Sequence, residues 1–88
     1  MERALTFHTD PGHAWLEVPK AELVGLGIDK DISPFSYMKG PTAYLEEDCD
    51  AGLFIDKLME AGTSFKFYEI HKENTPIRNY ASYSAGGR

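Results

Sequence analysis

Apolar and polar residues alternate in two segments near the start of the chain, 4–8 and 14–18. The apolar side of these segments consists of Leu5, Phe7, Leu16 and Val18. A period of two is typical of strands with one buried face. Between them, Asp10-Pro11-Gly12 favours a tight turn, because proline fixes φ at the second turn position and glycine accepts a positive φ at the third. The pattern therefore predicts a β-hairpin.

A wider apolar stripe predicts a helix over 49–61. When residues are placed at 100° intervals, the apolar ones fall within an arc of roughly 160°, as expected for a helix that faces a core. They are Ala51, Phe54, Ile55, Leu58, Met59 and Ala61. We expect Asp48 to cap the N-terminus of this helix and Gly62 to end it in a left-handed conformation.

A shorter helix is expected over 21–26. Pro19 suits the first helical position, where its missing N–H would have no partner in any case. Gly27 is the expected left-handed stop, after which Ile28 folds back on Leu23 or Val24 as an apolar contact.

Three further strands are predicted, over 35–39, 42–46 and 65–71. The first two flank Gly40-Pro41, and their two-sided apolar pattern leaves open which face turns inward. The predicted order is thus ββαββαβ. It indicates an α+β fold with a mostly antiparallel sheet and both helices on one face.

The periodicity is lost after residue 71. Ile77, Tyr80 and Tyr83 can still pack on the sheet as a strap, whereas residues 84–88 are expected to form a flexible tail. The single domain is therefore predicted to cover residues 1–83.

The composition narrows the classes of protein that fit this pattern. With 88 residues and 42% hydrophobic content, the chain is typical of one small globular domain. Fourteen acidic against nine basic residues give a formal charge of −5, which argues against direct nucleic-acid binding. The start of the chain lacks the apolar run of a signal peptide, and no run of 18 apolar residues occurs. We therefore expect a cytoplasmic protein without a membrane segment.

Two features have residue types that occur in catalytic sites. His8, Asp10 and His13 surround the predicted turn and resemble a metal-ligand set, although the turn alone explains the aspartate. Cys49, the only cysteine, stands at a predicted helix start, but its acidic neighbours disfavour a thiolate. We interpret it as a small, half-buried hydrophobic residue and expect no catalytic residue, metal or cofactor. A small metal-dependent hydrolase that uses the hairpin cluster remains an alternative.

The acidic residues concentrate around the start of the long helix. The run consists of Glu46, Glu47, Asp48 and Asp50, and Glu17, Asp29 and Asp31 are candidates to join it. Its spacing does not match an EF-hand loop. Two interpretations remain: a solvated helix cap, or an anionic surface for a basic partner. Like charges so close together repel one another and cost stability, and a patch this dense can therefore reflect a use in binding.

Four segments resemble a family of small phage and prophage proteins: residues 8–19, 35–37, 44–51 and 76–80. The similarity spans about residues 6–83. The family is identified as including an anti-CRISPR protein that acts on a type I-C surveillance complex. The resemblance implies a non-enzymatic inhibitor that binds protein subunits of that complex (Cascade) in the host cytoplasm and blocks target DNA binding.

The charge pattern is compatible with that role. We expect the partner-binding residues to be the seven carboxylates named above, with no cofactor, no direct nucleic-acid contact and no membrane contact. It would be a monomer or a weak homodimer. A phage housekeeping or interaction module is a further alternative.

Overall fold

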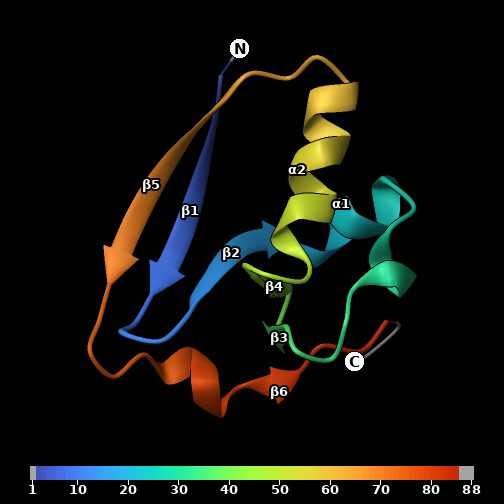
Figure 1. Ribbon diagram of the computed structural model, residues 1–88. Coiled ribbons are helices and arrows are strands. Elements are labelled where there is room, and N and C mark those ends of the chain that lie inside the picture. The colour runs from blue at the N-terminus through green and yellow to red at the C-terminus, as the bar shows by residue number, and fades with distance from the viewer. Residues whose placement is uncertain (1, 86–88) are drawn as a thin grey trace.

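The hairpin predicted from the alternation opens the fold. A computed structural model describes residues 2–85 of the chain (Figure 1). Its elements, in order, are β1 (Arg3–Thr9), β2 (Ala14–Pro19), α1 (Lys20–Gly25), the 3-10 turn η1 (Asp29–Asp31), β3 (Tyr37–Lys39), β4 (Thr42–Glu46), α2 (Ala51–Glu60), β5 (Phe65–His71), the 3-10 turn η2 (Pro76–Asn79) and β6 (Ala81–Ser82).

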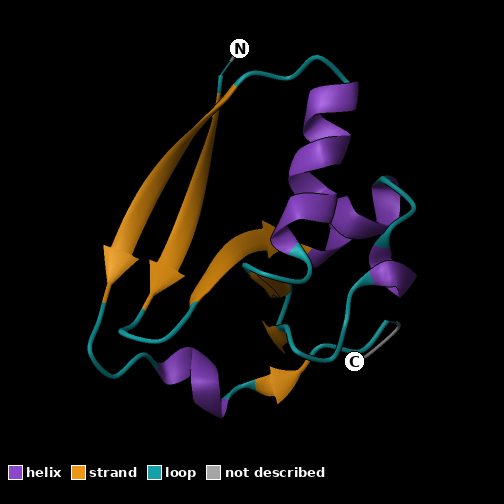
Figure 2. Ribbon diagram, viewed as in Figure 1, coloured by secondary structure: helices purple, strands orange, loops and turns teal. Residues whose placement is uncertain are grey.

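The six strands form one sheet in the order β5-β1-β2-β4-β3-β6. All neighbours are antiparallel except β1 and β5, which run parallel side by side (Figure 1). Helices α1 and α2 both contribute side chains to the core that covers one face of the sheet, and Figure 2 shows the helices, strands and loops in separate colours. The protein is thus an α+β domain with a mostly antiparallel sheet, as the element order predicts.

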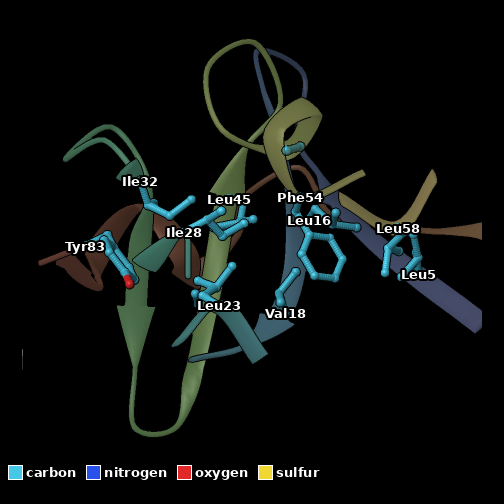
Figure 3. Packing of buried hydrophobic residues seen from close by; sticks show 12 residues of the cluster. Leu5, Leu16, Val18, Leu23, Ile28, Ile32, Leu45, Phe54, Leu58 and Tyr83 are labelled. Carbon is cyan, nitrogen blue, oxygen red and sulfur yellow. The ribbon is translucent and has the colours of Figure 1, made fainter. Parts of the chain in front are cut away.

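One face of the sheet packs against both helices. Leu16 and Leu45 lie opposite each other on β2 and β4 and are fully buried. Phe54 of α2 packs near Leu16, and Leu23 brings α1 into the same core (Figure 3). Burial of large apolar side chains of this kind contributes roughly 1.5–3 kcal/mol each. The inward face of β4, which the sequence left open, is therefore the one that carries Leu45.

The opposite face of the sheet carries a second, smaller buried group. Trp15 and Glu17 alternate with the core residues of β2, so they point away from the helices. Trp15 and Ile77 are each only 2% exposed, although neither belongs to the main core. Ile77 lies in η2, which confirms that the segment after β5 packs on the sheet as a strap.

Both helices end as predicted. Gly27 and Gly62 have φ values of +73° and +72°, a region that favours glycine. The N–H of Ile28 donates to the Leu23 carbonyl, and the N–H of Thr63 donates to the Leu58 carbonyl. These bonds define Schellman motifs, and Ile28 also joins Leu23 in the core.

Several element boundaries differ from the prediction. Pro19 ends β2 and is not the first residue of a helix. The third strand begins at Tyr37, because the preceding turn leaves Phe35 on the surface. Helix α2 begins at Ala51, so Asp48 is not its N-cap.

The buried stripe of α2 is narrower than predicted. Only Ala51, Phe54 and Leu58 are buried, while Met59 is 63% exposed and Ala61 is also exposed. The helix touches the sheet along one side only, so the outer part of the arc stays in solvent.

Two further expectations concern the C-terminal tail and the absence of a membrane-spanning segment. Ser84 and Ala85 are exposed, whereas the rest of the predicted tail, 86–88, lies outside the described residues. Across residues 2–85, no helix has the length and apolar content required to cross a bilayer.

Candidate binding cleft

A cleft of about 260 Å³ opens where the first hairpin, the start of β3 and the β4–α2 turn meet η2. Trp15, Glu46 and Tyr37 line it because strand pairing places them on the same sheet face: Trp15 lies opposite Glu46, and Tyr37 lies opposite Tyr44. The remaining lining residues come from loops and η2. The sheet therefore supplies a rigid base for the cleft.

Aromatic rings form much of the cleft wall. Trp15 and Tyr37 meet edge to face with ring centroids 6.1 Å apart, and the His13 ring lies 5.8 Å from Trp15. Phe35 also lines the cleft and is 68% exposed. The Nε1–H of Trp15 has no hydrogen-bond partner among the described residues. A buried donor without an acceptor is uncommon and costs roughly 1–3 kcal/mol.

Glu46 places a carboxylate in this cleft although the residue is only 7% exposed. Its Oε1 accepts hydrogen bonds from the N–H groups of Asp48 and Cys49 at 2.8 and 3.0 Å. Its Oε2 lies 3.5 Å from Nδ1 of His13, longer than an ordinary charge-assisted hydrogen bond. Glu46 thus fixes the β4–α2 turn with one oxygen and retains accepting capacity on the other.

Arg78 joins the cleft to the turn of the first hairpin. Its guanidinium donates from Nε and Nη2 to the two oxygens of Asp10 and lies 5.3 Å from the centre of the Trp15 ring. Asp10 also accepts from the N–H groups of Gly12 and His13. The guanidinium, followed by these N–H groups, holds the pKa of Asp10 well below its usual range. The charge of Arg78 is therefore neutralised within the chain.

Asp50 has a structural role of the same kind. The residue is 3% exposed and accepts hydrogen bonds from the Ser33 N–H, the Ser33 hydroxyl and the Ser36 hydroxyl. The Ser36 hydroxyl accepts in turn from the N–H of Glu46. Asp50 therefore holds the loop before β3 against the start of α2.

These contacts separate the seven predicted carboxylates into buried ones with internal partners and exposed ones. Glu46 and Asp50 are buried, so they cannot form part of an exposed patch as expected. Glu17 lies on the sheet face of the cleft, where its Oε1 is 2.6 Å from Nε2 of His8. Asp31, Glu47 and Asp48 are exposed and Asp29 is partly exposed.

The histidines of the first hairpin have separate partners. His8 contacts Glu17, His13 lies beside Glu46, and Asp10 is bound by Arg78. Within residues 2–85, no group of three or more His, Cys, Asp or Glu side chains is placed to hold a metal ion.

Cys49 lines the cleft and is exposed, so its interpretation as a half-buried residue is wrong. Desolvation by its surroundings, together with the Glu46, Asp50 and Asp48 carboxylates, raises the pKa of its thiol. The thiol therefore stays protonated at neutral pH, the form that is a poor nucleophile.

Comparisons with family models, with curated proteins and with solved structures find no match for this chain. The phage-protein resemblance accordingly stays a prediction.

Sequence reasoning missed four residues of the cleft: Trp15, Phe35, Tyr37 and Arg78. Local spacing gives no signal for Arg78, because its partner Asp10 is 68 positions away in the chain. The alternation places Phe35 in a strand, where the sheet would cover one side of the residue. A turn signal was present in Ser33-Pro34, which precedes it.

Proposed function

We propose that this protein is a non-enzymatic inhibitor of a type I CRISPR surveillance complex. It binds basic protein subunits through exposed carboxylates and prevents target DNA from binding. The observation that carries the proposal is the state of Asp31, Glu47 and Asp48: they are exposed and have no hydrogen-bond or ion-pair partner for their side chains within residues 2–85. The formal charge of −5 and the family resemblance support it as well.

The physical basis is competition for a cationic channel. A complex that holds DNA lines its channel with lysine and arginine, because these groups neutralise phosphates. A small domain with free carboxylates is attracted to the same surface, and complementary charge accelerates the encounter. Glu47 and Asp48 are well suited to this role, since the neighbouring Glu46 fixes the turn that presents them.

The experiment is a binding measurement between this protein and a purified type I-C surveillance complex without DNA, repeated at increasing salt concentration. We expect binding that weakens steadily as salt rises, and loss of target-DNA binding by the complex once the protein is bound. Absence of binding, or an affinity that does not change with salt, would overturn the proposal. A pull-down from infected cells that recovers only phage-encoded proteins would instead support the housekeeping alternative.

A further inference from the structure

We propose that the cleft between Trp15, Phe35 and Glu46 is a pocket for one arginine side chain of a protein partner. The inference rests on the proposed function in one respect: the arginine would belong to a subunit of the surveillance complex. The charge, the aromatic walls and the size of the cleft support an arginine pocket independently of that function.

The charges of the cleft favour a cationic guest. Arg78, the one arginine among the lining residues, already donates two hydrogen bonds to Asp10. The acidic groups in the lining are the carboxylates of Glu46 and Asp48. Glu46 is buried and keeps Oε2 available, and a buried carboxylate gains more from a cation than an exposed one does. An anionic guest would meet these carboxylates and is disfavoured.

The walls favour a guanidinium over an ammonium group. A planar guanidinium stacks on aromatic faces and binds a carboxylate with two parallel N–H groups, whereas an ammonium is a point charge. The chain already contains such a contact, since the Arg78 guanidinium lies 5.3 Å from the Trp15 ring centre. Because Trp15 is only 2% exposed, the aromatic surface open to a guest guanidinium is that of Phe35, which is 68% exposed, lines the cleft and lies outside the core.

The size of the cleft fits a peptide side chain. Its volume of about 260 Å³ is below that of pockets for drug-sized ligands, which begin at about 300 Å³. A single long side chain can therefore occupy the cleft while the peptide backbone stays outside it.

Trp15 is the only tryptophan of the chain, so its fluorescence reports directly on the cleft. The probes are capped Gly-Arg-Gly, its lysine counterpart and its citrulline counterpart, which has the shape of arginine without the charge. We expect a saturable change with the arginine peptide and at least about tenfold weaker binding of the other two. No saturable response, or equal binding of either counterpart, would overturn the inference.

Variants assign the binding to the cleft. Glu46→Gln keeps an oxygen that accepts from the N–H groups of the turn but removes the charge, and we expect about tenfold weaker binding. Phe35→Ala, at an exposed position, should weaken binding while leaving the fold intact. Glu60→Gln, outside the cleft, is the matched control and should bind like the original protein. If Glu46→Gln and Phe35→Ala both bind the arginine peptide as the original protein does, the site is not in this cleft.

The two proposals can fail separately. If the arginine peptide binds but the surveillance complex does not, the pocket stands and the proposed function falls. If the complex binds while the arginine peptide gives no response, only the pocket falls.

Discussion

Asp48 and Asp50 are two residues apart in the acidic run, yet their surroundings are opposite. Asp48 is exposed at the β4–α2 turn, whereas Asp50 is buried and accepts three hydrogen bonds from Ser33 and Ser36. Composition treats the two aspartates alike, but the fold gives one a structural role and leaves the other available to a partner. A count of carboxylates therefore overestimates the surface available for binding.

Truncation of these two aspartates should separate the two roles. Asp50→Ala leaves the buried Ser36 hydroxyl without its acceptor, so we expect the free energy of unfolding to fall by about 1–3 kcal/mol. Asp48→Ala should change it by no more than about 0.5 kcal/mol, since the side chain is exposed. Denaturant unfolding of both variants measures the difference. Equal losses would mean that Asp50 does not hold the Ser33–Ser36 loop.

At the scale of elements, the Asp10–Arg78 pair links the first hairpin to η2. The same carboxylate organises the turn after β1 through two N–H groups and holds the strap that buries Ile77. One side chain thus connects a local turn to a contact between segments far apart in sequence. Stability should depend on its ionisation.

We expect this link to weaken in acid. The pKa of Asp10 is lower in the folded protein than its unfolded value of about 3.9, so its contribution is complete above that value and is lost as pH falls below it. Asp10→Asn retains an acceptor for the turn but lacks the charge. It should therefore unfold at a lower temperature than the original protein near neutral pH.

Thermal unfolding of both proteins from pH 7 to pH 3 checks this expectation. The difference between their midpoints should shrink as the pH decreases through about 4. A difference that stays constant over this range would contradict the account, because the other carboxylates are shared by both proteins.

The elements themselves were largely predictable from the sequence. Alternation identified β1 and β2, and the glycines that end α1 and α2 have the positive φ values expected of them. Local patterns succeeded where local forces decide the structure. They could not give the parallel pairing of β1 with β5, because that contact joins segments far apart in sequence, with Arg3 opposite Phe65.

The cleft was predictable only in part. Glu46, Asp48 and Cys49 were singled out because they cluster in sequence, and all three line it. Their meeting with Trp15 depends on the register between β2 and β4, and their meeting with Arg78 depends on the strap. Neither is encoded in spacing along the chain.

At the scale of the whole molecule, only part of the formal charge of −5 lies on carboxylates that a partner could contact. Part of the negative charge is used inside the fold, by Asp10 and Asp50. Asp48 is exposed and lines the aromatic cleft, and Glu47 is exposed beside it in the same turn, so the turn after β4 presents charge next to an apolar surface. A cleft with apolar walls and charged neighbours has the composition common at protein interfaces, which combine an apolar centre with a charged rim.

The most direct test of this account compares two double charge reversals for binding to the purified type I-C surveillance complex. Glu47→Lys with Asp48→Lys changes the turn beside the cleft, and Asp56→Lys with Glu60→Lys makes the same change in net charge on exposed positions of α2. We predict that the first pair reduces affinity by about tenfold or more at low salt, and that the second has a much smaller effect. Equal losses, or unchanged binding by the first pair, would contradict the claim that this turn contacts the complex.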